Sequence, residues 1–216
     1  MEELSANNRR EWFNDNKASY LAAQQNMIDF VASVITAMNQ HDELEDISAK
    51  KCLYRIYNDV RFSKDKSPFN PHFAFGFRRA TKLKRGGYYV NIRPNNHFLA
   101  CGFFAPNPED LKRIRLDIER NYEVWNDLLG SEEIKTNFGE FQGSKVASAP
   151  RGFSIDHPGI ALLRHKQFIL KHDFSDQEVL AADFDQQVNR ILKSVRPIFD
   201  YMSEVLTTDL NGELIV

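Results

Sequence analysis

Charged side chains alternate in the middle of the sequence, between Arg55 and Lys66. On a strand, Arg55, Asp59 and Arg61 would point to one face, because side chains alternate along an extended chain. Two guanidinium groups flanking a carboxylate could hold a phosphate or carboxylate through paired hydrogen bonds, with Asp59 orienting Arg61. Lys64 and Lys66 follow in a loop and could contact the same anion. This pattern predicts a binding site for a small anionic ligand, with or without catalysis.

Arg93, in a neighbouring predicted strand, could join these residues. The same residue types also fit a structural ladder of arginine and aspartate between strands. Cross-strand pairs of that kind each contribute about 0.2–1 kcal/mol to stability. The choice between a site and a ladder depends on whether this strand face is open or covered.

Charge is distributed unevenly along the chain, although the net charge is only −2. Residues 50–93 contain twelve Lys or Arg and two acids, a net charge of +10, and the remainder has 16 bases and 28 acids. A local basic segment in an acidic protein suggests an anionic partner for that segment. Acidic helices that fold back over the segment would explain the same numbers.

Two further function classes fit the basic segment. The run of bases at 78–85 lies among Phe and Tyr residues, a composition that can combine base stacking with phosphate contacts. An RNA or single-stranded DNA binding module is therefore the second hypothesis. The third is a scaffold or interaction protein in which the charged string only supports the fold.

The sequence lacks the common motifs for metals, cofactors and nucleophilic catalysis. Its six histidines are scattered without HxH or HxxxH spacing, and its two cysteines, Cys52 and Cys101, form no CxxC pair. It has no GxSxG, no GxGxxG and no P-loop. We therefore expect no bound metal and no cofactor.

The order of the predicted elements favours an α+β fold with a mainly antiparallel sheet packed against several helices. No linker or repeat divides the chain, so we expect one domain over residues 1–216. Apolar residues at helical spacing predict helices over 17–39, 107–129 and 176–206. Segments of β-like composition predict strands over 53–60, 73–78, 87–93, 97–104 and 166–172.

Three local signals fix element ends. Pro94 with two following asparagines predicts a turn, so the strands on either side of it should form a hairpin. Asn107 before Pro108 is a helix start, and Ser175 with Glu178 forms a capping box.

The chain also shows no membrane or export signal. No apolar run approaches the roughly 20 residues that span a bilayer. The first residues lack the basic and then apolar layout of a signal peptide. With only two cysteines, the simplest interpretation is a cytoplasmic protein with reduced thiols and no membrane partner.

Several strings in the sequence resemble one family in order along nearly the whole chain. They are NNRREWFNDNKASY, RIYNDVRFSKDKSPFNPHF, GGYYVNIRPNNHFLACGFFAP, LKRIRLDI and RGFSIDHP. The chain resembles the bacterial family DUF2461, a domain family without an assigned function. The resemblance implies one conserved domain and transfers no catalytic residue.

Overall fold

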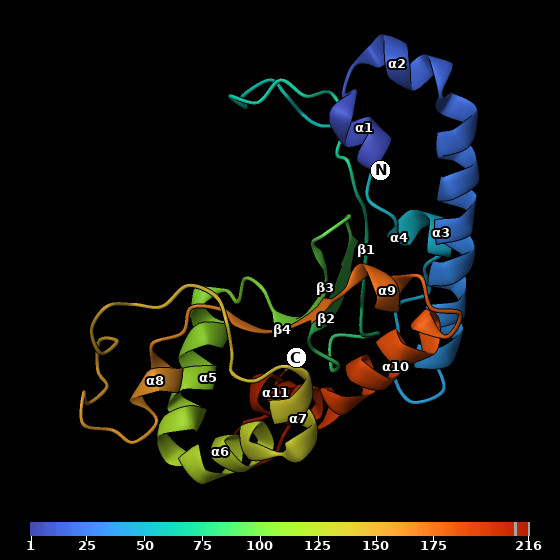
Figure 1. The fold of residues 1–216 in the computed structure, drawn as a ribbon. Coiled ribbons are helices and arrows are strands. Elements are labelled where there is room, and N and C mark those ends of the chain that lie inside the picture. The colour runs from blue at the N-terminus through green and yellow to red at the C-terminus, as the bar shows by residue number, and fades with distance from the viewer. Residues whose placement is uncertain (210, 216) are drawn as a thin grey trace.

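The protein, described by a computed structural model over residues 1–209 and 211–215, has a four-stranded antiparallel sheet at its centre. The strands lie in chain order, and Phe75, Val90 and Leu99 stand side by side across the first three. The α+β class and the antiparallel sheet expected from the sequence are confirmed. Figure 1 shows the strands, β1 (Phe73–Arg78), β2 (Gly87–Ile92), β3 (His97–Phe103) and β4 (Phe168–Phe174).

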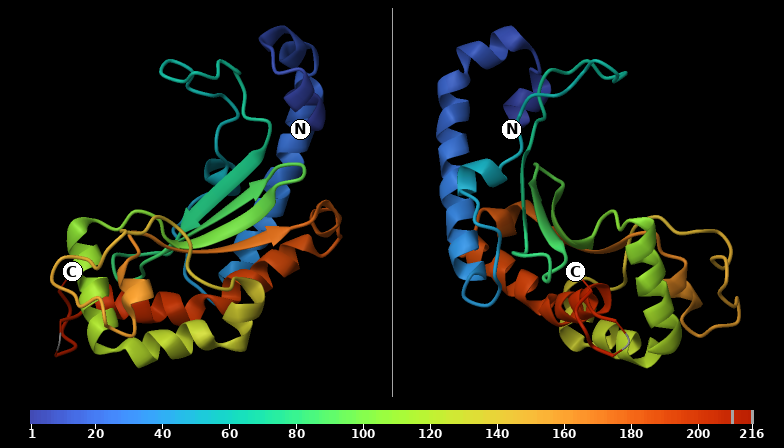
Figure 2. Two further views of the ribbon diagram at one scale, coloured as in Figure 1. Left: turned by 60° about the vertical axis from the view of Figure 1, so that its left-hand side comes forward. Right: turned by 180° about the vertical axis from the view of Figure 1, so that it is seen from behind.

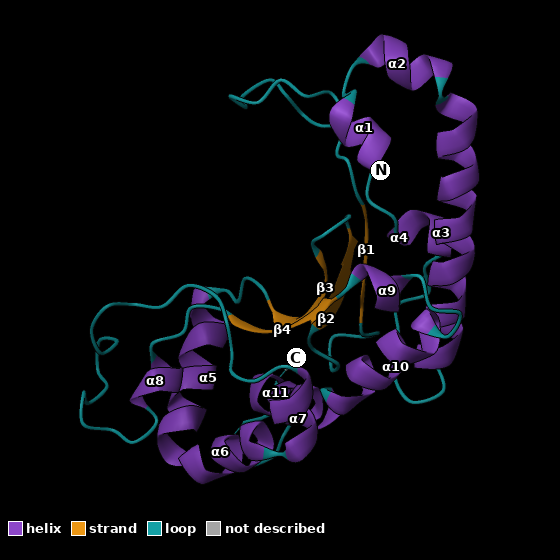
Figure 3. Cartoon of the chain, in the orientation of Figure 1, coloured by secondary structure: helices purple, strands orange, loops and turns teal. Residues whose placement is uncertain are grey.

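Helices precede, interrupt and follow the sheet (Figure 3). Those before β1 are α1 (Glu2–Ala6), α2 (Arg10–Asp15), α3 (Lys17–Met38) and α4 (Ala49–Cys52). Those between β3 and β4 are α5 (Pro108–Arg120), α6 (Tyr122–Gly130), α7 (Glu132–Asn137) and α8 (Ile160–Leu163). Those after β4 are α9 (Asp176–Val179), α10 (Phe184–Ser194) and α11 (Arg196–Thr207). None of the described helices is long and apolar enough to cross a membrane.

The helix expected over 17–39 is confirmed as α3, and other helix starts follow their local signals, but two of the expected helices are interrupted. Asn107 accepts a hydrogen bond from the backbone of Asp110 at 2.9 Å, and the capping box at Ser175 forms as predicted. The single helix expected over 107–129 is wrong: Asn121 leaves helical geometry (φ −122°, ψ 36°) and separates α5 from α6. The helix expected over 176–206 is likewise three helices.

The strand expected over 53–60 does not form, and Figure 3 draws this segment as loop. Its pairing with the segment that leads into β1 is limited to two isolated bridges, Leu53 with Phe75 and Tyr57 with Phe69. The pairing register shifts between these bridges, and Pro71 in the facing segment has no N–H to donate. A continuous ladder is therefore impossible here.

One face of the sheet carries the main hydrophobic core. Phe75, Val90 and Leu99 are fully buried on this face, against residues such as Val31 of α3 and Phe199 of α11. Figure 2 shows α3, α10 and α11 on this side of the sheet. Each buried side chain of this size contributes about 1.5–3 kcal/mol, so the core holds the sheet and these helices together.

A second, smaller group of buried side chains lies at the N-terminal end. We call it the N-terminal cluster: Leu4, Phe13, Ile56 and Phe69. The rings of Phe13 and Phe69 stack with centroids 4.1 Å apart. The Asn8 side chain donates to the carbonyl of Phe69 at 2.8 Å and accepts from its N–H at 3.1 Å. These contacts fasten α1 and α2 to the chain that enters and leaves the charged string.

Candidate functional site

The charged string lies on a loop that extends away from the sheet and the helices (Figures 1 and 2). We call residues 55–66 the basic loop. The predicted contact residues in it are all exposed: Arg55, Asp59, Arg61, Lys64 and Lys66. The string is therefore an open surface and not a covered ladder between strands.

Two contacts give the basic loop a defined shape. Arg61 donates to both carboxylate oxygens of Asp59, through Nε at 2.9 Å and Nη2 at 2.7 Å, and the two side chains are 76% and 60% exposed. Arg61 holds the pKa of the Asp59 carboxyl below its usual value, and Asp59 raises the pKa of Arg61. Lys66 Nζ donates to the carbonyl of Val60 at 2.9 Å, which links the two sides of the loop.

An aromatic side chain stands beside these charges. Phe62 is 95% exposed, and the Arg61 guanidinium lies 5.9 Å from its ring centroid. The ring of Phe62 is therefore accessible from solvent beside a guanidinium group. Among the described residues, no acidic side chain forms an ion pair with Arg55 or Lys64.

Arg93 lies near the point where the loop rejoins the sheet. Its side chain is exposed, one residue after β2, whose last residue pairs with the first residue of β1. Burial lowers the pKa of His72, just before β1, and the positive charge of Arg93 lowers it further. The register therefore places Arg93 beside His72, six residues after the end of the basic loop.

Other bases of the segment 50–93 are neutralised inside the molecule. Arg79 contacts Asp42 through Nε at 3.0 Å and also pairs with Asp200. Asp42 further accepts from the Tyr88 hydroxyl at 2.6 Å and lies 3.2 Å from a guanidinium nitrogen of Arg196. We call these five residues the buried ion-pair cluster.

Two more bases of the run at 78–85 have acidic partners. Lys84 pairs with Glu43 at 2.6 Å, and Arg85 pairs with Asp110 at the start of α5. Acidic residues folding back thus explain this part of the basic segment. They do not explain the basic loop.

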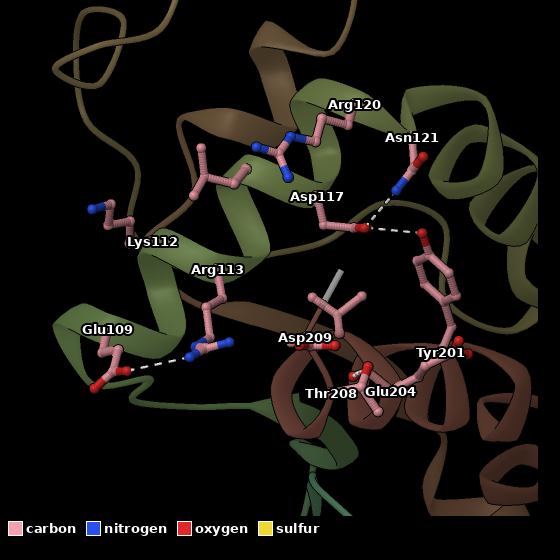
Figure 4. Close-up of a pocket in the computed structure, with 12 residues that line it drawn as sticks. Glu109, Lys112, Arg113, Asp117, Arg120, Asn121, Tyr201, Glu204, Thr208 and Asp209 are labelled. Atoms are coloured by element: carbon pink, nitrogen blue, oxygen red, sulfur yellow. Dashed lines mark hydrogen bonds and ion pairs between the residues drawn. The ribbon is translucent and has the colours of Figure 1, made fainter. Parts of the chain in front are cut away.

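Away from the basic loop, a concave groove with a volume of about 580 Å³ lies between α5 and α11 (Figure 4). At its centre, Asp117 accepts hydrogen bonds from the Tyr201 hydroxyl at 2.8 Å, Trp125 Nε1 at 2.7 Å and the Asn121 amide at 2.7 Å. Burial and then the Asp117 hydrogen bond raise the pKa of Tyr201. These hydrogen bonds join α5, α6 and α11. Because the Asp117 carboxylate already accepts three hydrogen bonds and the raised pKa keeps Tyr201 protonated, the pair is poorly suited to acid–base chemistry.

Sequence reasoning missed this groove. Asp117 and Tyr201 are 84 positions apart and no local motif links them. None of the six predicted residues lines this groove or any of four further cavities of the structure. Within residues 1–209 and 211–215, no group of three or more His, Cys, Asp or Glu could hold a metal ion.

Comparison with known proteins places the chain in a family. The family described as "Conserved hypothetical protein (DUF2461)" matches residues 1–201. The chain belongs to the DUF2461 family. No curated protein and no solved structure gave a match.

Two of the strings that resemble DUF2461 meet in space. NNRREWF contributes Asn8 and Phe13, and RIYNDVRFSKDKSPF contributes Ile56 and Phe69, all in or against the N-terminal cluster. In this DUF2461 protein, one string therefore supports the loop that the other string forms.

Proposed function

We propose that this DUF2461 protein binds single-stranded nucleic acid through the basic loop. Arg55, Arg61, Lys64 and Lys66 contact phosphates, and Arg93 adds a contact where the loop rejoins the sheet. The observation that carries the proposal is an exposed phenylalanine among exposed cations on a protruding loop. Lysine and arginine neutralise backbone phosphates, and an aromatic ring stacks on a base of any sequence.

A site for a small phosphate- or carboxylate-bearing ligand has less support. Such sites are concave and enclose about 70–90% of a drug-sized ligand's surface. The cavity nearest the loop, about 400 Å³, is lined by Arg10, Tyr57 and Asn58 among others, and the predicted cations do not line it. Cations on a protruding loop can reach successive phosphates of a polymer without enclosing any of them.

Salt dependence tests the proposal. Binding of a fluorescent single strand of about 15 nucleotides is measured by anisotropy over a range of salt concentrations. Five neutralised phosphates give a log–log slope of about −3.5, and each lost contact reduces its magnitude by about 0.7. Arg55→Gln and Lys64→Gln should each do so, because both side chains are exposed and without an acidic partner in the described chain.

Two further variants sharpen the result. Phe62→Ala should weaken binding by about 1–3 kcal/mol and leave the salt slope unchanged, because it removes stacking and no charge. Lys112→Gln, at a lysine that is also exposed but lies on α5, is the matched control and should change neither quantity. Equal loss in Lys112→Gln and Lys64→Gln would overturn the proposal, as would absence of binding to the wild type.

A further inference from the structure

The face of the sheet opposite the main core has no helix packed on it in the described part of the chain (Figure 2). Its outward positions on the first three strands include small residues. On β1 and β2 these are Ala74, Gly76 and Gly87; on β3 they are Ala100 and Gly102. Ala74 and Ala100 are nearly buried (3% and 6% exposed) and Gly102 is buried, so among these residues the backbone is partly exposed only at Gly76 and Gly87.

Aromatic rings cross this open face in a row. Tyr54 and Tyr89 have ring centroids 5.8 Å apart, and Tyr89 and Phe98 are also 5.8 Å apart. Lys171 Nζ lies 5.0 Å from the Phe98 centroid. Tyr54, at one end of the row, is 60% exposed and immediately precedes the first residue of the basic loop. The row of rings and the basic loop are thus continuous along the chain.

A hollow of about 430 Å³ opens beside Tyr54 and Tyr89. We call it the glycine hollow, because Gly76 and Gly87 lie in its lining. The Tyr54 hydroxyl covers Gly76, 3.1 Å from where a Cβ would lie, whereas the nearest atom to a Cβ at Gly87 is 3.6 Å away, so the free space is at Gly87. Phe104, a partly exposed aromatic residue, also lines it. Arg78, also in the lining, is exposed and forms no ion pair within the described residues.

We infer that the glycine hollow is a stacking site for one base of a single strand, with Arg78 contacting the adjacent phosphate. The inference rests on the proposed function and extends it from phosphate contact to base recognition. Glycine lets a planar ring approach the backbone, and tyrosine rings stack on the faces of bases without regard to sequence. A base paired in a duplex cannot enter the hollow, so the site selects single strands. The cation in its lining complements the strand's charge.

Gly87→Val tests the hollow without removing an aromatic or charged group. A Cβ at Gly87 would lie 3.6 Å from the Phe77 carbonyl oxygen and 3.9 Å from Arg78 Cγ, which are ordinary contact distances. Valine is favoured in strands, so the variant should fold. Its side chain would fill space that the base requires.

The expected loss of single-strand affinity in Gly87→Val is about 5- to 150-fold, from about 1–3 kcal/mol per stacked base. The salt slope should not change. Gly130→Val, the same substitution on α6 where the nearest atom to a Cβ is 3.9 Å away, is the control and should bind like wild type. Tyr54→Leu removes one ring from the exposed end of the row and should also lose affinity.

The two proposals fail differently. If Gly87→Val folds but binds like wild type while Lys64→Gln loses slope, the inference is wrong and the proposed function stands. If Gly87→Val does not fold, unchanged binding in Tyr54→Leu alone overturns the inference. A wild type that binds a duplex of the same sequence as tightly as the single strand also overturns it. If the basic-loop variants leave binding and slope unchanged, the proposed function is wrong.

Discussion

Asp42 is the central acceptor of the buried ion-pair cluster, and its replacement by asparagine should destabilise the protein strongly. Its side chain is 0% exposed, and the Arg79 side chain beside it is 1% exposed. Asparagine keeps the shape of aspartate but removes the charge, and its NH₂ group would face the Tyr88 hydroxyl or the guanidinium of Arg79. Arg79 would then remain buried next to a neutral partner, with only Asp200 left to balance it.

The size of the effect follows from burial. Breaking a buried ion pair by removing one partner costs about 3–5 kcal/mol, whereas an exposed pair contributes about 0–1 kcal/mol. An unfolding entropy of about 2.1 cal/mol/K per residue over 216 residues converts the buried loss into a Tm decrease of about 7–11 °C.

Calorimetry and urea denaturation would measure this loss, with Asp59→Asn as the matched control. Asp59 undergoes the same chemical change in an aspartate–arginine pair, but both of its partners are exposed. The control should lie within about 1 kcal/mol of wild type. If Asp42→Asn were no less stable than Asp59→Asn, the buried cluster would not stabilise the fold and the reasoning would be wrong.

Three further predictions concern other parts of the structure. Gly102→Ala should lower the free energy of unfolding by about 1–3 kcal/mol or more in urea titrations, because a Cβ at φ +139° would lie 2.0 Å from a carbonyl oxygen of β4. Gly130→Ala, in α6, should instead raise it by up to about 1 kcal/mol, because alanine favours the helix more than glycine does. Burial raises the pKa of both the Cys52 and Cys101 thiols, so neither should react with Ellman's reagent until the protein is denatured, when both should. Burial lowers the pKa of His165, so the unfolded chain binds its proton first and stability should fall as pH drops below about 6.5. His165→Gln should reduce the Tm difference between about pH 7.5 and about pH 5.5.

Elements with local signals were predictable from the sequence. The hairpin around Pro94, the helix start at Asn107 and the capping box at Ser175 all depend on residues within a few positions of one another. The break at Asn121 was not predictable, because it accompanies a carboxylate, Asp117, that also binds a tyrosine from the last helix. The absence of the strand expected over 53–60 was not predictable either, because its pairing depends on the segment around Pro71 and not on its own residues.

The candidate site was predictable in position but not in its electrostatics. Composition located the basic segment, and the exposed loop lies within it. Composition could not separate Arg61, whose partner is two residues away, from Arg79, whose partners are 37 and 121 residues away. Which cations remain available depends on these distant pairings.

The open face of the sheet has a signal of its own in the sequence. Gly76 and Gly87 stand at outward positions of neighbouring strands, where solubility alone would favour larger polar residues. Glycine inside a strand often marks a close approach by another group. Alternation alone, however, does not tell which side of a sheet its helices will cover.

The N-terminal cluster gives the molecule two cores of unequal size. It contains four buried hydrophobic side chains, apart from the much larger main core. A region with few buried contacts opens more readily than the whole protein unfolds, so amides paired across it, such as Asn70 to Ile56, should exchange hydrogen sooner than those of the sheet. The loop that these four residues anchor can therefore acquire substitutions, and change its affinity or its partner, while the free energy that keeps the sheet and helices folded stays almost the same.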